Sequence, residues 1–197
     1  YNYLTEKGYI IFTLDNRGTG GRGKAFKNLA YGDIGHYALK DHIEGAKYLS
    51  SLPYVDKDRI GIWGWSGGGY LTLMAMTKGS DYFKCGISVA PVSDFRFYDT
   101  IWAERYMGLP QDNEAGYDLT SVLTHVNQFK DGHLLVVHGT ADDNVHMQNT
   151  MRFAQAMQQH TKPFDLMLYP EKRHSILGQS TRLHLYTMMT DYILEHL

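Results

Sequence analysis

The sequence predicts an α/β fold with a mainly parallel sheet that is covered by helices on both faces. Three observations predict it: short apolar runs, helical periodicity between them, and the regular alternation of the two along the chain. The runs are mostly apolar rather than alternating, as expected for parallel strands that are buried on both faces. They predict strands over residues 9–14, 59–63, 85–90, 133–138 and 164–169.

The segments between and after these strands carry apolar residues at helical spacing. Residues 37–52 combine one apolar stripe with charged residues off it, which predicts an amphipathic helix. Residues 146–160 and the last segment of the chain repeat the pattern. The stripes are Leu39, Ile43, Ala46 and Leu49 in the first helix, Met147, Met151, Ala154 and Met157 in the second, and Tyr186, Met189, Ile193 and Leu197 in the last.

The chain is interpreted as one domain. Its 197 residues suffice for a single core, and neither a repeat nor a linker interrupts them. Residues 94–127 have the least regular pattern and are expected to form an excursion between two strands. Because barely a helix-length of residues precedes the first predicted strand, we expect residues 1–197 to be part of a longer chain. Missing upstream strands would leave one edge of the sheet exposed.

Composition argues against several classes of partner. The net charge is −2 with no block of like charge, so neither nucleic acid nor an anionic membrane surface is expected. No apolar run reaches the roughly 18 residues of a transmembrane helix, and residues 1–8 lack the pattern of a signal peptide. The single cysteine, Cys85, excludes an internal disulfide and leaves the compartment undecided.

Residues 64–68 fit the pattern G-x-S-x-G, which is the nucleophile elbow of α/β-hydrolases. The serine of such an elbow lies in a sharp turn with a strained backbone, and its neighbours come close together. We expect glycine at Gly64 and Gly68 to remove side chains that would otherwise collide. A glycine-rich turn in another kind of α/β protein is the alternative. Ser66 is the predicted nucleophile.

The surroundings of this motif favour the elbow. A predicted strand over residues 59–63 comes directly before it, and a helical pattern over residues 70–76 comes directly after it. Gly79 is well placed to end that helix. The N–H of Gly67 would then lie at a helix N-terminus and face the position where an oxyanion forms.

A serine hydroxyl becomes nucleophilic when a histidine accepts its proton, and a carboxylate fixes the tautomer of that histidine. In α/β-hydrolases the chain order is serine, acid, histidine. Asp142 follows the strand over residues 133–138 by a short turn, and His174 similarly follows the strand over residues 164–169. All three groups therefore fall at the carboxyl ends of strands. We predict Ser66, Asp142 and His174 as the catalytic triad.

Other assignments stay open on the residues alone. Asp143 is an alternative acid, in which case Asp142 caps the helix that follows. His138 and His146 are alternative bases or structural histidines. His138 is expected to be buried because it belongs to a strand, and His146 shares a segment with the acid, which leaves no role for His174.

The segment G-I-W-G-W-S-G-G-G-Y over residues 61–70 resembles the nucleophile region of the prolyl oligopeptidase family of serine peptidases. Later stretches are similar to the dipeptidyl peptidase IV branch of that family. The resemblance runs from about residue 9 to the end, and its longest motif is H-G-T-A-D-D-N-V-H over residues 138–146. The other stretches are F-K-C-G-I (83–87), A-P-V-S (90–93), Y-D (98–99) and E-R-Y-M-G-L-P (104–110).

The resemblance implies the same triad and favours Asp142 over Asp143. It implies neither a metal nor another cofactor. It also implies that Asn144 binds a substrate carbonyl and that a small apolar S1 pocket buries a proline ring between aromatic walls. Without the resemblance, these aromatic residues would be assigned to the ordinary core. The implied pocket residues are Val92, Phe95, Tyr98, Trp102, Tyr106 and Val145.

The sequence departs from the branch pattern at three positions. Gly67 stands where tyrosine is common, and Phe95 and Trp102 stand where tryptophan and tyrosine are usual, so S1 is expected to be reshaped. The resemblance places a tyrosine that donates the second oxyanion hydrogen bond upstream of this chain, together with a β-propeller that holds the amino terminus of the substrate. It also implies a homodimer of the full-length protein in the periplasm, outside the cell or anchored to a membrane.

The loop over residues 16–24 carries a competing motif, because it satisfies G-x-G-x-x-G directly after a predicted strand. It also matches a P-loop except that Ala25 replaces the hydroxyl residue that binds magnesium. Helical periodicity begins only near residue 37, so no helix N-terminus is expected at the loop to hold a phosphate. Asp41 and Glu44, which lie at about the ribose-binding distance, belong to that helical segment. The glycines of the motif are Gly18, Gly20 and Gly23.

The expected activity is that of a serine exopeptidase that releases dipeptides with proline or alanine in second position through an acyl-enzyme. The alternatives are a tripeptidyl peptidase or oligopeptidase of the same family, a general esterase, and a non-catalytic homologue retained for interaction. The groups that would measure the length of the released peptide lie outside this chain.

Overall fold

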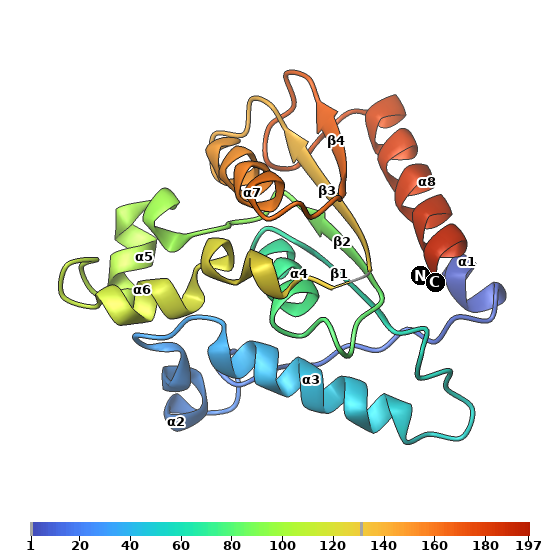
Figure 1. Cartoon of the computed structure of the whole chain (residues 1–197), viewed down its shortest axis with the longest axis horizontal. Helices are drawn as coiled ribbons and strands as arrows, with labels where there is room; N and C mark the ends of the chain where they lie inside the picture. The colour runs from blue at the N-terminus through green and yellow to red at the C-terminus, as the bar shows by residue number, and fades with distance from the viewer. Residues whose placement is uncertain (1, 131) are drawn as a thin grey trace.

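A computed structural model describes residues 2–130 and 132–197 of the chain. Its strands form one sheet in which neighbours follow the order of the sequence, β1-β2-β3-β4, and every pair is parallel (Figure 1). The predicted α/β class with a parallel sheet is confirmed. The strands are β1 (Gly61–Trp65), β2 (Cys85–Val89), β3 (His133–Gly139) and β4 (Asp165–Tyr169).

Helices cover both faces of this sheet (Figure 1). Helices α4 (Gly67–Thr77) and α7 (Gln148–Gln159) pack on one face, where α3 (His36–Ser50) lies against α4, and α8 (Gln179–His196) packs on the other. The remaining elements are the short helices α1 (Asn2–Glu6), α2 (Lys24–Lys27), α5 (Thr100–Met107) and α6 (Glu114–Thr120), and the 3-10 helices η1 (Asn28–Ala30), η2 (Phe95–Phe97) and η3 (Val122–Gln128).

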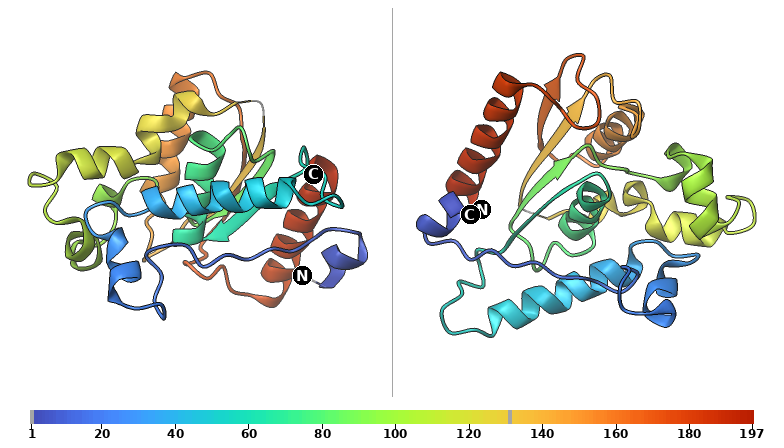
Figure 2. Two further views of the ribbon diagram at one scale, coloured as in Figure 1. Left: turned by 90° about the horizontal axis from the view of Figure 1, so that it is seen from below. Right: turned by 180° about the vertical axis from the view of Figure 1, so that it is seen from behind.

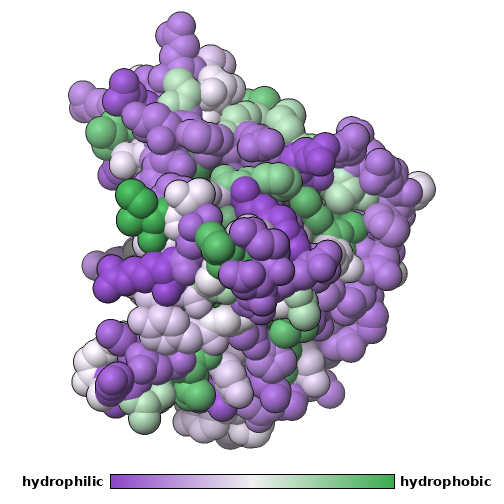
Figure 3. Space-filling model, turned by 90° about the vertical axis from the view of Figure 1, so that its left-hand side faces the viewer, coloured by the Kyte–Doolittle hydropathy of each residue, from purple (hydrophilic) through white to green (hydrophobic). Residues whose placement is uncertain are grey.

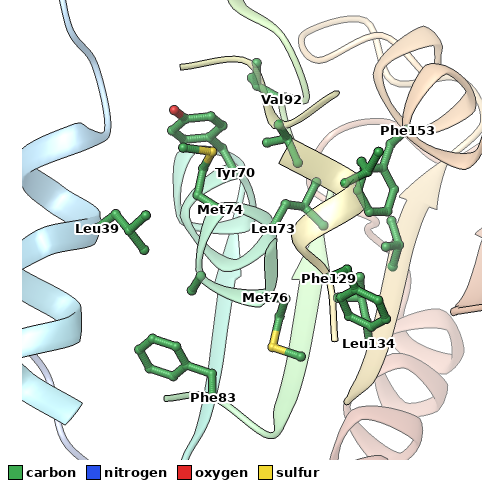
Figure 4. Close-up of a cluster of buried hydrophobic side chains, with 14 of the residues drawn as sticks. Leu39, Tyr70, Leu73, Met74, Met76, Phe83, Val92, Phe129, Leu134 and Phe153 are labelled. Carbon is green, nitrogen blue, oxygen red and sulfur yellow. The ribbon is translucent and has the colours of Figure 1, made fainter. Parts of the chain in front are cut away.

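The main core is built around α4, which is apolar on all sides. Such a helix is stable only when it is covered all round, and here β1 and β2 cover one side while α3 and η3 cover others. Leu73, Met74 and Met76 are almost completely buried as a result. Figure 4 shows Leu39 of α3 on one side of this helix and Phe153 of α7 on the other. This packing holds the start of α4 in place at the end of β1.

The prediction of a strand over residues 9–14 is wrong. The segment is extended but pairs with no described strand, and the main-chain N–H groups of residues 10–14 make no hydrogen bond within the described part of the chain. It runs past α3 beside the open edge of the sheet (Figure 2). A cavity of about 640 Å³, lined by residues of this segment and of β1, separates the two. A ladder needs strands roughly 4.8 Å apart, so the cavity prevents pairing.

The other predicted strands and helices lie close to their expected places, and the excursion between two strands is the region from η2 to η3. That region is more regular than its weak periodicity indicated, because three of its four short helices have an N-cap side chain that accepts a main-chain N–H. Asp94 caps η2, Asp99 accepts from the N–H of Trp102 at the start of α5, and Asn113 caps α6. Each capped helix is too short to show an apolar stripe.

Gly79 does not end α4 through a left-handed conformation. The helix ends at Thr77, Lys78 remains in the right-handed region, and Gly79 has no positive φ. A side chain at this position would instead place its Cβ 2.8 Å from the carbonyl oxygen of Ala75. The glycine is therefore required by close approach rather than by backbone conformation.

Candidate active site

Ser66 lies in a sharp turn between β1 and α4. Its backbone has φ 59° and ψ −115°, a conformation that a side chain disfavours. Two main-chain hydrogen bonds hold the turn: the N–H of Ser66 donates to the carbonyl of Val89 at 2.8 Å, and the N–H of Tyr70 donates to the carbonyl of Ser66 at 2.9 Å. The first bond ties the turn to the carboxyl end of β2, and the second starts the helix.

Only one of the two flanking glycines is required for the reason expected. A Cβ on Gly64 would overlap the backbone of Gly68, whereas a Cβ on Gly68 would meet nothing within 4 Å. The close approach of the two backbone segments thus requires a glycine at Gly64 but not at Gly68. Gly67 is the first residue of α4, where main-chain N–H groups have no partner inside the helix.

Asp142 occupies the turn after β3, and its side chain is completely buried. Its Oδ1 accepts the N–H groups of Asn144 and Val145, both at 3.0 Å. Its Oδ2 lies 2.8 Å from Nδ1 of His174 and 3.2 Å from Nε2 of His138. Burial alone would raise the pKa of Asp142, but the hydrogen bonds from His138, His174 and the main chain outweigh it and hold the pKa well below its usual range. The carboxylate is therefore ionised at neutral pH.

His174 is held in the loop between β4 and α8. Trp65 is the last residue of β1 and precedes Ser66. Its indole N–H donates to the main-chain carbonyl oxygen of His174 at 3.0 Å. The loop also packs over the turn that carries the acid: the N–H of Ala141 donates to the carbonyl of Lys172 at 3.1 Å. A Cβ on Gly139 would overlap that same carbonyl. Asp142 and His174 thus lie on two loops that are bonded to each other.

The alternative residues occupy other places. Asp143 forms an exposed ion pair with Arg173 at 3.2 Å, and His146 is exposed. His138 is fully buried, which confirms the expectation for a histidine within a strand. The structure brings His174, rather than His138, to an accessible position beside the acid. The hydrogen bonds of the described residues join Asp142 to His174 but include none between His174 and Ser66, as is common before a substrate is bound.

The aromatic residues singled out from the sequence form one cluster. Trp102 of α5 stands at its centre and contacts Phe95, Tyr98 and Tyr106, with ring centroids 5.7, 5.4 and 5.0 Å away. Phe95 is buried against Tyr70 of α4, whereas Trp102 is 39% exposed. The cluster therefore has a core side and a solvent side. Val92 and Val145 belong to the same buried core.

Asn144 connects this aromatic cluster to the turn that carries the acid. Its Oδ1 accepts a hydrogen bond from the Tyr98 hydroxyl at 2.9 Å. This bond uses the acceptor of the amide and leaves the NH₂ group on its other side, where it can donate to a carbonyl. Burial raises the pKa of the Tyr98 phenol, and the nearby charges of Asp99 and Asp142 raise it further. Tyr98 is therefore a neutral donor over the whole physiological range.

The glycine-rich loop makes a different set of contacts from those of a nucleotide site. The helix that follows it, α2, has only four residues. Arg17 of the loop turns back to α3, where its Nη2 lies 2.6 Å from Oδ1 of Asp41 and its main-chain N–H donates to Oδ2 at 2.7 Å. The carboxylate of Asp41, which lies at the ribose-binding distance, is thus already bonded to Arg17. The loop joins the first extended segment to α3.

Three contacts of the site were not foreseen from the sequence. They are the bond from Trp65 to His174, the packing of Lys172 over Gly139, and the contact between Thr150 of α7 and His138. Trp65 lies within the motif around Ser66, and Gly139 lies within the motif around Asp142. Those motifs were the available sequence signal for the first two contacts. Thr150 lies outside every motif.

The described residues include no group of three or more His, Cys, Asp or Glu side chains arranged to hold a metal ion. Among the described helices, none has the length and apolarity to span a bilayer. The face in Figure 3 carries hydrophobic side chains in small groups between hydrophilic ones.

Comparison with known proteins gives consistent results. The model of the prolyl oligopeptidase family matches residues 1–197. The chain is 41% identical over 190 residues to a probable dipeptidyl-aminopeptidase B of Ajellomyces capsulatus, covering 95% of this chain and 21% of that protein. It is 39% identical over 194 residues to the mouse (Mus musculus) prolyl endopeptidase FAP, covering 97% of this chain and 26% of that protein.

Two solved structures have the same fold. The crystal structure of Porphyromonas gingivalis dipeptidyl peptidase 4 is 49% identical with a TM-score of 0.91, and the match covers 93% of this chain and 26% of that one. A putative dipeptidyl aminopeptidase IV from Bacteroides ovatus is 39% identical with a TM-score of 0.96, covering 99% and 27%. The chain therefore spans about a quarter of the length of these proteins.

Proposed function

We propose that the parent protein of this chain, which belongs to the prolyl oligopeptidase family, is a serine peptidase that releases dipeptides from peptide amino termini. The proposed substrates carry proline or alanine in second position. Ser66, Asp142 and His174 form the proposed triad. The hydrogen bond of 2.8 Å between Asp142 and His174 is the observation that carries the proposal.

The proposed acylation begins with attack of Ser66 Oγ on the carbonyl carbon of the second substrate residue. Nε2 of His174 takes the hydroxyl proton, and the buried charge of Asp142 stabilises the imidazolium that forms. The oxyanion receives the N–H of Gly67 at the start of α4. When the tetrahedral intermediate collapses, the C–N bond breaks and His174 gives its proton to the leaving amine. An acyl-enzyme on Ser66 remains.

Deacylation repeats these steps with water. His174 takes a proton from water, the resulting hydroxide adds to the acyl carbon, and Ser66 leaves with the proton returned by His174. The dipeptide forms as a carboxylic acid that releases its proton to solvent, and each group of the enzyme regains its starting protonation state. This chain's own residues supply the nucleophile, the base and the acid.

The proposed S1 pocket is the solvent side of the aromatic cluster. A pyrrolidine ring is small and apolar, and aromatic walls bury it without leaving a polar group unpaired. Trp102 would form the main wall because it is the cluster residue with a large exposed surface. Asn144, whose acceptor is used by Tyr98, would donate to the carbonyl of the first substrate residue.

The proposal leaves two parts of the reaction to sequence outside this chain. These are the second donor to the oxyanion and the acidic groups that hold the free amino terminus of the peptide. We propose that residues 1–197 are one part of a peptidase catalytic domain. The open edge at β1 and the cavity beside it support this domain assignment.

Hydrolysis of Gly-Pro-p-nitroanilide by the full-length protein tests the activity. We expect fast release by the wild type, and a loss of about 10⁴-fold or more in kcat for Ser66→Ala and Asp142→Asn, because each change removes a group of the triad. Asp143→Asn is the matched control for the acid. It removes only an exposed ion pair, so its rate should stay within a few-fold of wild type.

Labelling of Ser66 by a fluorophosphonate separates the possible failures. No peptide hydrolysis with normal labelling would retain the serine hydrolase and reject the dipeptidyl specificity. No labelling of the correctly folded protein would reject the triad. If Asp142→Asn kept full activity and Asp143→Asn lost most of it, Asp143 rather than Asp142 would be the acid of the triad.

A second candidate is a peptidase that cuts longer peptides or internal bonds. The likeness to the mouse protein named prolyl endopeptidase FAP favours it. Both functions need the same triad and the same S1 pocket, so this chain alone does not separate them. Turnover of an Ala-Ala-Pro reporter or of an amino-terminally blocked Gly-Pro reporter, without turnover of free Gly-Pro, would favour this second candidate.

A further inference from the structure

His138 is a second histidine on the carboxylate of Asp142, and no step of the reaction described above uses it. It lies on β3, and its side chain is completely buried. Its Nε2 is 3.2 Å from Oδ2 of Asp142 and 2.8 Å from the carbonyl oxygen of Val145. Its Nδ1 is 2.7 Å from the hydroxyl of Thr150 on α7.

These partners fix the tautomer of the ring. Both groups that face Nε2 are acceptors, so Nε2 carries a hydrogen. The Thr150 hydroxyl has no other hydrogen-bond partner among the described residues, and a buried hydroxyl hydrogen needs an acceptor. Nδ1 of His138 is that acceptor. The ring is therefore neutral, with its hydrogen on Nε2.

We propose that His138 is a positioning residue of the catalytic acid, which holds Oδ2 of Asp142 toward His174 while the Thr150 hydroxyl fixes its tautomer. The proposal rests on the triad proposed above. A neutral donor orients the carboxylate without cancelling its charge. Asp142 thus keeps its full charge for the imidazolium that forms on His174 during the reaction.

The titratable groups around Asp142 determine how the rate of a reaction at Ser66 depends on pH. The titratable ones are His138, His174 and Tyr98, and Tyr98 remains neutral because burial raises the pKa of its phenol. Asp143 and Arg173 form an exposed pair on the neighbouring surface. Labelling needs a base that takes the proton of Ser66, so the acidic limb of the profile belongs to that step.

The test is the pH dependence of the rate constant with which a fluorophosphonate labels Ser66 in the full-length protein. This reaction needs the triad but no peptide specificity. In His138→Leu we expect labelling to slow by about 10- to 100-fold, as for other partners that orient a reacting group. The acidic limb should move to higher pH, because a carboxylate with one neighbouring donor fewer presents more negative charge to the base.

The conservative variants separate positioning from packing. His138→Gln keeps an N–H donor and should recover part of the rate. Thr150→Val removes the hydroxyl at nearly constant volume and should shift the limb in the same direction, whereas Thr150→Ser should restore it. Thr77→Val is the matched control, because its buried hydroxyl bonds only to carbonyls of its own helix. It should lower stability and leave the profile in place.

An unmoved acidic limb in folded His138→Leu and Thr150→Val would overturn the positioning role and reduce His138 to a packing residue. If His138→Leu does not fold, Thr150→Val decides the question alone. Wild-type protein that is folded but not labelled would reject the triad, and this role with it. Normal labelling without hydrolysis of Gly-Pro substrates would reject only the dipeptidyl specificity.

Discussion

At the scale of single residues, Asp142 accepts three hydrogen bonds on a carboxylate whose side chain is completely buried. Two come from main-chain N–H groups and one from the ring of His174, and the ring of His138 lies 3.2 Å away. Burial without these neighbours would favour the protonated acid. Together they reverse that tendency, and so the negative charge is built into the folded state rather than induced by a substrate.

The lowered pKa of Asp142 has a consequence for stability. A carboxyl whose pKa is lower in the folded state than the roughly 3.9 of an unfolded aspartate stabilises the fold above that pH. The contribution is lost as the pH falls through the folded value. We therefore expect Asp142→Asn to lower the free energy of unfolding most near neutral pH, and the difference from wild type to shrink below about pH 4.

Urea unfolding of both proteins at several pH values measures this difference. Asp143→Asn provides the comparison, because its exposed ion pair contributes little at any pH. A difference between wild type and Asp142→Asn that stays constant from neutral pH down to about pH 3 would contradict the lowered pKa.

The pairing of Asp142 with His174 was predictable because two regularities bring them together: the chain order of hydrolase triads and the carboxyl ends of parallel strands. Their supporting contacts follow no such rule. Trp65 and His174 are 109 residues apart, and Thr150 contacts His138 from a helix. Only folding brings these side chains together, so a local pattern cannot reveal them.

At the scale of elements, the turn at Ser66 depends on one close contact between the end of β1 and the start of α4. A Cβ on Gly64 would overlap the backbone of Gly68, so Gly64→Ala must push the serine turn aside. We expect a loss of about 1–3 kcal/mol in stability, as for other overpacked sites, together with a large loss of fluorophosphonate labelling.

Gly68→Ala is the matched change, because a Cβ there meets nothing within 4 Å. Thermal unfolding and labelling of the two variants, measured side by side, check the prediction. Equal effects of the two substitutions would show that the motif needs its glycines for some reason other than this contact.

Residues 9–14 show what an apolar run predicts and what it does not. Its hydrophobic residues predict burial in a sheet, but Ile10 is 52% and Phe12 44% exposed. Apolar periodicity carries no information about which strand lies alongside. Four of the five predicted strands have a described neighbour, and this one faces a cavity.

Amide hydrogen exchange on the 197-residue chain tests this description. Residues 10–14 should exchange at nearly unprotected rates, because their N–H groups have no hydrogen-bond acceptor in the described structure. The amides of β2, between two partner strands, should be protected most. Equal protection of both segments would mean that residues 10–14 pair with β1 in solution.

At the scale of the whole molecule, α8 has two apolar faces. One, with Leu185 and Met189, is buried against the sheet. The other carries Leu183, Tyr186 and Leu194, which remain exposed and lie within one sector of the helix. We propose that this face contributes to the homodimer expected of the full-length protein, because apolar side chains gathered on one exposed face favour protein contact.

A charge in this face should weaken the dimer. We expect Leu183→Glu to shift the full-length protein from dimer toward monomer in light scattering coupled to size-exclusion chromatography. Tyr48→Glu, at another exposed position on α3, serves as the control and should leave the mass unchanged. A monomeric wild type, or a dimer that tolerates Leu183→Glu, would contradict the assignment.

Strand order in this sheet coincides with the order in which the chain is made, and this has a consequence for biosynthesis. A ribosome delivers the serine first, the acid next and the histidine last, each after its own strand. In the proposed mechanism, the base for Ser66 is missing until the loop after β4 has emerged, so the incomplete site stays unreactive. A nascent chain would therefore not acquire its proposed reactive centre gradually. It would acquire it when the loop that packs Lys172 over Gly139 is complete.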